Sequence, residues 1–135
     1  MRSFRTRLSS LVAVGASMAF TGAAAEPTKA SRMVTEIEAA YETSGARELS
    51  VLDIARRHID TRQSEDDIAK ALAPEGFKYF PSSQTGHPGA GYRKRWVGKS
   101  TPREGAPREI YIYIVPEGDK RVIDAAVIRV SGDFL

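Results

Sequence analysis

Cysteine is absent from the 135-residue chain, and several kinds of chemistry are excluded with it. Without thiols there is no disulfide framework, no thiolate metal site, no cysteine nucleophile and no iron–sulfur cluster. A chain without disulfides must be stabilised by its hydrophobic core alone. With 41% hydrophobic and 27% charged residues, the composition is that of a globular protein, neither disordered throughout nor fibrous.

Histidine is scarce, and neither His58 nor His87 belongs to a metal-binding motif. No H-x-x-x-H or H-E-x-x-H spacing occurs, and the Asp66-Asp67 pair lacks the loop pattern of a calcium site. The glycine-rich loop at 86–91 matches neither a P-loop nor the dinucleotide fingerprint, and a G-x-S-x-G nucleophile elbow is missing. The sequence therefore predicts no metal and no cofactor.

One catalytic alternative stays open in the loop over residues 82–91, S-S-Q-T-G-H-P-G-A-G. His87 lies there among glycines and a proline, where a side chain is accessible and can act as a general base. Ser82, Ser83 and Thr85 are its neighbours in sequence. A hydrolase or anion-binding enzyme built around His87 and this loop is the alternative to a non-catalytic protein.

Long hydrophobic runs are also missing, and the one apolar stretch belongs to a predicted secretory signal peptide over residues 1–25. Arg2, Arg5 and Arg7 precede an apolar run from about residue 8 to 20, and Ala23-Ala24-Ala25 supplies a small-residue cleavage site. The run is shorter than the about 20 residues that a spanning helix needs. We expect cleavage near Ala25, a periplasmic or secreted product, no later membrane span and, without a cysteine at the cleavage point, no lipid anchor.

The basic balance of the chain, a formal charge of +3, has its source in that leader. The leader holds three of the 20 basic residues and none of the 17 acidic ones, so residues 26–135 carry equal numbers of both. Basicity therefore gives no support to a nucleic-acid partner, and we expect none.

The remaining chain predicts a mobile lead-in at 26–30 and a single α+β domain over 31–135. Apolar residues at helical spacing predict helices over 31–43, 50–59 and 64–72, with Ser50 and Ser64 as N-caps. In the third helix Ile68, Ala71 and Leu72 form the expected apolar side.

From residue 76 onward the pattern changes to that of strands. Strands are predicted over 76–80, 92–97, 109–115 and 121–130, with loops over 82–91 and 98–108 and a turn over 116–120. In the strand 109–115 the three isoleucines should face the helices and Tyr111 and Tyr113 the open side. In the last strand, Asp124 is expected on the face of Ala126 and Ile128, opposite Ile123. We expect two or three N-terminal helices on one face of a three- to four-stranded antiparallel sheet.

The segment from Ile54 to Phe77 resembles the SmpA/BamE family of small outer-envelope proteins and, more loosely, the β-lactamase-inhibitor-protein fold. The order of a helix, a short capped helix and antiparallel strands carries this resemblance. Within it, a helix-start signal, an apolar pair and a glycine correspond to Ser64, Ile68, Leu72 and Gly76. The resemblance implies a non-catalytic, protein-binding module.

The stretch of the chain richest in interaction-prone residues is 92–99, Y-R-K-R-W-V-G-K, which has four basic residues and the only tryptophan. Tyrosine, tryptophan and arginine are enriched in interface hot spots. The candidate binding residues are Tyr92, Arg93, Lys94, Arg95 and Trp96. On a strand, Tyr92, Lys94 and Trp96 share one face and the two arginines share the other.

The alternative reading of this stretch is a solvated strand whose tryptophan closes the core. Our leading hypothesis is a small exported binding or accessory protein without catalytic activity, which contacts an envelope or secreted protein or an anionic ligand. Arg56, Arg57 and Arg62 extend its basic surface only if the fold brings them near.

Overall fold

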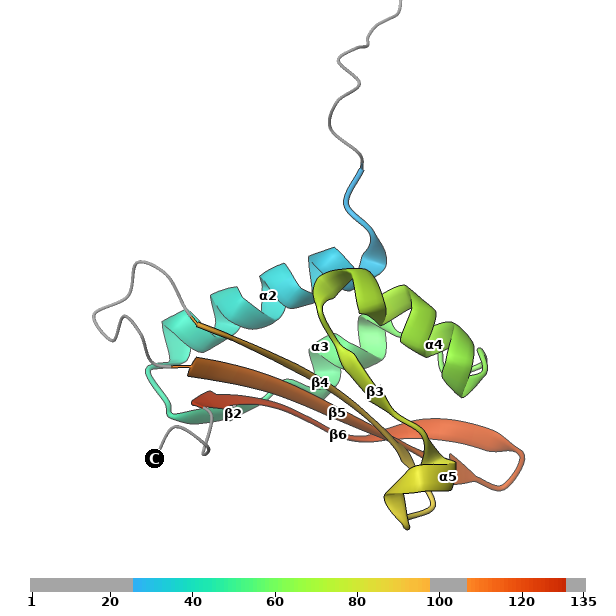
Figure 1. Ribbon diagram of the computed structural model, residues 1–135. Helices are drawn as coiled ribbons and strands as arrows, with labels where there is room; N and C mark the ends of the chain where they lie inside the picture. Colours follow the sequence, from blue (N-terminus) through green and yellow to red (C-terminus); the bar gives the residue numbers. More distant parts are fainter. Residues whose placement is uncertain (1–25, 98–106, 131–135) are drawn as a thin grey trace, which may run out of the picture.

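The computed structural model describes residues 26–97 and 107–130, so the predicted signal peptide lies outside the described residues. The fold is α+β, as predicted, with the three N-terminal helices on one face of a five-stranded antiparallel sheet in the order β2-β6-β5-β4-β3 (Figure 1). The helices are α2 (Lys29–Ser44), α3 (Leu52–His58), α4 (Glu65–Leu72) and α5 (Ser82–Thr85), with a 3₁₀ turn η3 (Ala73–Glu75). The strands are β2 (Glu48–Ser50), β3 (Lys78–Phe80), β4 (Ala90–Val97), β5 (Pro107–Glu117) and β6 (Lys120–Val130).

Helix α2 begins two residues before the predicted helix 31–43, and its N-cap explains the earlier start. The Thr28 hydroxyl accepts a hydrogen bond from the Ser31 N–H at 3.0 Å, and Gly45 ends the helix with φ of 69°. Met33, Ile37 and Tyr41 recur at helical spacing and are buried against the sheet.

Helix α4 begins at the predicted cap. The Ser64 hydroxyl accepts from the Asp67 N–H at 3.1 Å, and acidic residues occupy the first turn, where the helix dipole favours them. Ile68 and Leu72 are buried as expected. The prediction for Ala71 is wrong, because its side of the helix is exposed.

The predicted helix over 50–59 is shorter than expected, and the N-cap prediction for Ser50 is wrong. The Glu48–Ser50 backbone instead pairs with β6, and the Val51 N–H continues that pairing by donating to the Ala126 carbonyl at 2.8 Å. Helix α3 therefore starts at Leu52, without a side-chain cap. Hydrogen bonding to the sheet satisfies the N–H of Val51, the residue at the N-cap position of α3.

The β5–β6 hairpin is tighter than the predicted turn over 116–120. Glu117 pairs directly with Lys120, which leaves a two-residue connection in which Gly118 adopts φ of 67°. Further along, an irregularity shifts the register, since Tyr113 pairs with Ala125 but Ile114 pairs with Ile123.

This β-bulge leaves Asp124 without a partner and corrects the predicted faces of the last strand. Ile123, Ala126 and Ile128 are buried in the core, whereas Asp124 is exposed. A bulge inserts one residue and so reverses the alternation on one side of it.

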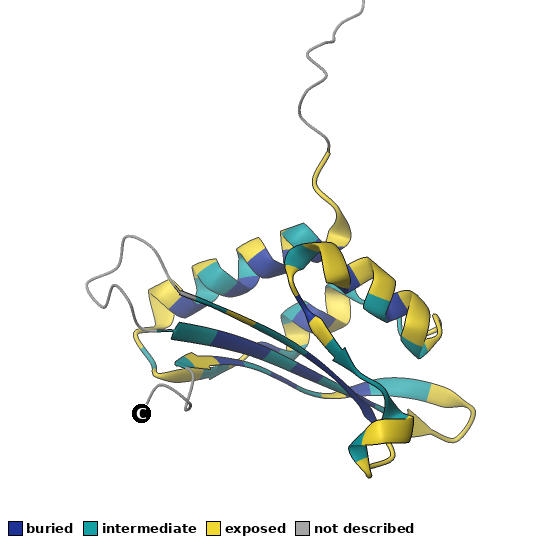
Figure 2. Cartoon of the chain, viewed as in Figure 1, coloured by how far each residue is buried: buried dark blue, intermediate teal, exposed yellow. Residues whose placement is uncertain are grey.

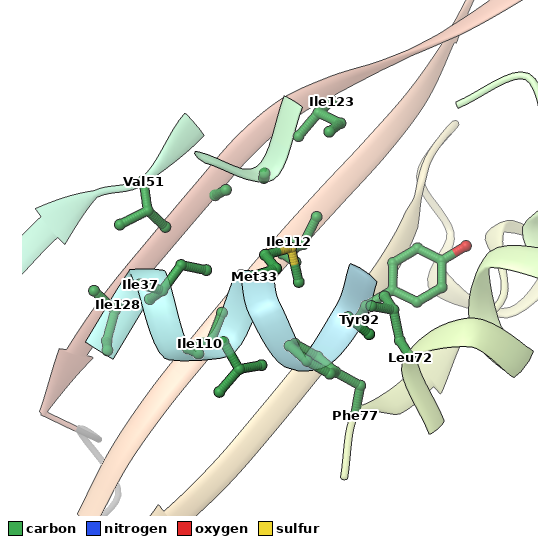
Figure 3. Packing of buried hydrophobic residues seen from close by; sticks show 14 of the residues in the cluster. Met33, Ile37, Val51, Leu72, Phe77, Tyr92, Ile110, Ile112, Ile123 and Ile128 are labelled. Carbon is green, nitrogen blue, oxygen red and sulfur yellow. The ribbon is translucent and has the colours of Figure 1, made fainter. Parts of the chain in front are cut away.

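The core lies between α2, α3, α4 and the inner face of the sheet (Figures 2 and 3). Ile110, Ile112 and Ile114 face the helices and are buried, as the alternating pattern of 109–115 predicts. Phe77 and Leu72 close the core beside β4.

Three strand and loop predictions need correction. The sheet has five strands rather than three or four, because Glu48–Ser50 adds an edge strand. The predicted loop over 82–91 contains α5 and the start of β4. Most of the loop predicted over 98–108 lies outside the described residues, while Pro107 and Arg108 belong to β5. No helix in the described part of the chain has the length and apolar character needed to cross a membrane.

Candidate functional site

Strand β4 divides the five candidate binding residues between two faces of the sheet. Tyr92, Lys94 and Trp96 point toward the helix layer, and Arg93 and Arg95 lie on the opposite face. The alternation of a strand predicts this division. The five residues therefore do not form one surface.

Tyr92 belongs to the core and is removed from the candidate binding surface. Its side chain is fully buried, its ring stacks on Tyr79 with centroids 5.3 Å apart, and its hydroxyl donates to the Glu65 carbonyl at 3.1 Å. Burial raises the pKa of Tyr92 far above its usual range, which keeps the hydroxyl protonated. A group in this position supports the packing of α4 on the sheet and cannot reach a partner.

Lys94 and Trp96 also serve the helix side. The Lys94 ammonium donates to the Glu75 carbonyl and lies 5.1 Å from the centre of the Trp96 ring. Trp96 is partly buried against the core. The tryptophan thus closes the core edge, as the alternative reading of this stretch expected.

On the opposite face, Arg93 and Arg95 gather around a carboxylate that sequence reasoning missed. Glu109 on β5 is 3% exposed, although it lies on the uncovered side of the sheet. Its Oε2 atom is 3.1 Å from the Arg95 Nε atom and 3.5 Å from that of Arg93, and its Oε1 atom is 3.1 Å from the Arg129 Nε atom. Three cations therefore surround a single anion.

The register of the sheet explains why these charges meet. Arg95 lies opposite Glu109, Glu109 opposite Arg129, and Arg129 opposite Glu48, so one row of alternating charge crosses β4, β5, β6 and β2. We call the set of Arg93, Arg95, Glu109 and Arg129 the arginine cluster. Opposite charges directly across a strand pair stabilise each other. The pattern of one strand does not indicate its register against the next strand. The sequence therefore could not predict that Glu109 and Arg129 meet the arginines of β4.

An aromatic patch lies next to the arginine cluster on the same face. Tyr111 and Tyr113 are stacked with centroids 6.3 Å apart and are partly buried, on the open side that the sequence predicted. Burial raises the pKa of Tyr111. On the neighbouring strand, the Arg93 guanidinium lies 5.1 Å from the centre of the Phe80 ring.

Two glycines allow these tyrosine rings to lie flat. A Cβ atom at Gly91 would lie 2.9 Å from the Tyr111 hydroxyl oxygen. One at Gly89 would lie 2.5 Å from the Ile114 carbonyl oxygen and 2.9 Å from the Tyr113 ring. Glycine in a strand marks such close approach. The glycine-rich end of the predicted loop over 82–91 thus supplies the floor of the aromatic patch.

On the face that carries the arginine cluster and the aromatic patch, α5 is the only helix of the described residues 26–97 and 107–130, and it lies at the end of β3 and β4 away from the arginine cluster (Figure 1). Helices α2, α3 and α4 all lie on the other side of the sheet (Figure 1). Arg56 and Arg57 belong to α3 and therefore to the helix side, so they do not extend the arginine cluster.

The histidine loop does not assemble the catalytic arrangement that the alternative requires in the described residues. His87 is exposed. Its backbone N–H donates to the Thr85 hydroxyl at 3.1 Å, and its carbonyl accepts from the same hydroxyl at 3.2 Å. The Ser82 hydroxyl donates at 2.6 Å to the carboxylate of Glu65 on α4, and not to His87. Partial burial opposes ionisation of Glu65, but hydrogen bonds from Ser82 and Tyr79 outweigh it and lower the pKa.

His58 joins α3 to α2. Its Nε2 atom is 2.9 Å from the Glu36 carboxylate, which also pairs with Arg57. Hydrogen bonds from Arg57 and His58 lower the pKa of Glu36 to about 2. No group of three or more histidine and acidic side chains suited to a metal ion occurs among the described residues.

A groove of about 840 Å³ runs beside this ion pair, between α2, β2 and α3. Ala39 and Ala40 form part of one wall and Leu52 and Ile54 part of another. Small side chains on α2 create the hollow.

Comparisons with protein-family models, with curated proteins and with solved structures give no match to this chain. The resemblance to the SmpA/BamE family stays a prediction. The candidate site therefore rests on the geometry of the open sheet face.

Proposed function

We propose that this protein is an exported, non-catalytic binding protein that docks an acidic protein of the cell envelope on the open face of its sheet. The working surface consists of the arginine cluster and the adjacent pair Tyr111 and Tyr113. The observation that carries the proposal is the gathering of three guanidinium groups around the buried carboxylate of Glu109, on the sheet face opposite α2, α3 and α4.

Arg93 and Arg129 offer N–H donors beyond the Nε–H groups that contact Glu109. Each guanidinium group carries five N–H donors, and the single carboxylate of Glu109 offers about four acceptor sites. The side chains of Arg93, Arg95 and Arg129 are 33%, 38% and 45% exposed, so they remain within reach of a partner. Partner carboxylates can accept bidentate hydrogen bonds from such groups, which are stronger than bonds between neutral groups.

Glu109 also holds the arginines in place before a partner arrives. Two of the three Nε atoms contact it at 3.1 Å, so part of the side-chain entropy that binding would otherwise cost is lost already on folding. Tyr111 and Tyr113 add flat, amphipathic contact area of the type found at interface hot spots. A protein partner can use both features, whereas a small anion would use only the charge.

The predicted signal peptide places the acidic partner outside the cytoplasm. Intact mass analysis of the exported protein should give a chain that starts at Glu26, after removal of residues 1–25. Retention of the full chain in the cytoplasm would contradict this part of the proposal.

Binding is tested with the variant Arg93→Gln/Arg129→Gln, which removes two charges and leaves Arg95 with Glu109. The matched control is Arg32→Gln/Arg47→Gln, which removes two exposed arginines that form no ion pair with described residues. Chemical cross-linking in an envelope fraction identifies partners, and the anisotropy of a labelled polyglutamate peptide measures binding of a defined acidic chain.

We expect the Arg93/Arg129 variant to lose the cross-linked partner and to bind polyglutamate at least about tenfold more weakly. The control should retain both. Equal losses in the two variants would indicate non-specific charge attraction and contradict the proposal. Competition by simple carboxylate ions as effective as that by polyglutamate would favour a small anionic ligand instead.

A further inference from the structure

A second concentration of positive charge lies on the other side of the molecule, where the loop after α3 meets the start of β6. Two cavities of about 290 and 220 Å³ adjoin there, and Thr61 and Arg121 line both. Arg56 completes the polar lining of the first cavity, and Arg62, Lys120 and Asp119 that of the second. None of these residues belongs to the arginine cluster.

The charges around these cavities are unbalanced. Four cationic side chains line them, against one carboxylate, that of Asp119. Arg62 pairs with Asp60 at 3.0 Å and is thereby neutralised. Arg56 and Lys120 form no ion pair with any residue in the described part of the chain. The like charges repel one another, and a bound anion would relieve that repulsion.

The side chain of Arg121 gives independent evidence for a hydrogen-bond acceptor beside these cavities. One terminal nitrogen of its guanidinium group donates to the Gln63 carbonyl, which fixes the side chain between the loop and β6. Its Nε–H group is buried and has no hydrogen-bond partner among the described residues. Buried polar groups are almost always paired, and an unpaired one calls for a water or an ion beside it.

We propose that this cluster binds a tetrahedral oxyanion group of the phosphate type. Arg56, Lys120 and Arg121 would supply positive charge and N–H donors, and the Thr61 hydroxyl a further donor. An oxyanion seated against Arg121 would supply the acceptor that its buried Nε–H lacks. Since a water molecule occupies about 30 Å³ in the liquid, a cavity of 290 Å³ holds a phosphate group and several waters.

The test titrates the purified protein with inorganic phosphate at constant ionic strength, with chloride as the reference ion. Two-dimensional NMR follows the amides of Thr61 and Arg121 and the Nε–H signal of Arg121. We expect saturable shifts at these groups and a dissociation constant of about 1 mM. Absence of saturation, or shifts that centre on the arginine cluster, would overturn the inference.

Three variants make the result specific. Arg56→Gln should weaken phosphate binding about tenfold, and Arg121→Lys, which keeps the charge but removes the planar donors, should weaken it too. Arg32→Gln on α2 removes an exposed charge elsewhere and should leave binding unchanged. Equal affinity in Arg56→Gln and Arg32→Gln would contradict the site, and because Arg56 is exposed its loss should leave the fold intact.

A parallel titration with glycerol phosphate distinguishes the source of the group. Tighter binding of the ester than of inorganic phosphate indicates a phosphate carried by a larger molecule. Exclusive binding of inorganic phosphate indicates the free ion. Both results depend on the cavity and are independent of whether the open sheet face binds an acidic protein.

Discussion

Replacement of Glu109 by glutamine should lower the stability of the fold and raise the affinity of the open sheet face for an acidic chain. Because the two quantities should change in opposite directions, one variant distinguishes them. Glu109→Gln keeps the size of the side chain and one acceptor oxygen but removes the negative charge between three arginines. Breaking a fully buried ion pair costs about 3–5 kcal/mol. Here the carboxylate is 3% exposed but its partners are 33–45% exposed, so water solvates much of the uncompensated charge.

We therefore expect Glu109→Gln to lower the free energy of unfolding by about 1–3 kcal/mol, the cost of losing charge-assisted hydrogen bonds to partly solvated donors. At the same time, the open face gains one net positive charge. The glutamine oxygen can still accept from an arginine and so keeps part of the ordering that Glu109 provides. The added net charge should therefore dominate, and affinity for polyglutamate should rise about two- to fivefold, in line with up to about 1 kcal/mol for one exposed charge. Urea denaturation and fluorescence anisotropy measure the two effects on the same sample.

Glu48→Gln is the matched control, because it changes the charge of the same row by the same amount. Glu48 is 60% exposed and lies 3.9 Å from Arg129, so its loss should cost less than about 0.5 kcal/mol of stability. Its effect on polyglutamate affinity should resemble that of Glu109→Gln. A Glu109→Gln variant with unchanged stability, or with weaker binding than the native protein, would refute the reasoning.

Three further predictions concern the scaffold and its response to pH. Gly89→Ala should lower the melting temperature more than Gly91→Ala. A Cβ at Gly89 meets a backbone carbonyl, whereas one at Gly91 meets the end of a side chain that can move. The reverse order of melting temperatures in thermal unfolding would contradict this prediction. Ser64→Ala should cost about 1 kcal/mol in urea denaturation through loss of the α4 cap, and Ser64→Asp should restore it. The pKa of Glu36 is lowered from 4.5 to about 2, so its contribution to stability is present above pH 4.5 and is lost as the pH falls toward 2. Glu36→Gln should remove this part of the acid dependence, and an unchanged acid profile would contradict the assignment.

Local signals in the sequence predicted the features that depend on local physics. The cap at Ser64, the isoleucine face of 109–115 and the open position of Tyr111 and Tyr113 all follow from spacing within one element. Features that depend on contacts between distant segments were missed. Strand β2 exists because the Glu48–Ser50 backbone pairs with β6, which overrides a good capping residue at Ser50.

The candidate site shows the same limit more sharply. Alternation along β4 correctly divided Arg93 from Tyr92, but it gave no sign that Tyr92 would be buried. Glu109 and Arg129 meet these arginines only through the registers of two strand pairs, and a single sequence without a register cannot reveal that. The bulge at Asp124 likewise has no local signature in the strand, and it decides which residues of β6 face the core.

The central claim is that the open sheet face, and not the helix side, contacts an acidic partner. The arginine Nε–H signals in an NMR spectrum of the protein with added polyglutamate test it most directly, because each signal reports one side chain. Our account predicts shifts at Arg93 and Arg129, with Arg32 and Arg47 unchanged. Shifts confined to arginines of the helix side, with those of Arg93 and Arg129 unmoved, would contradict it.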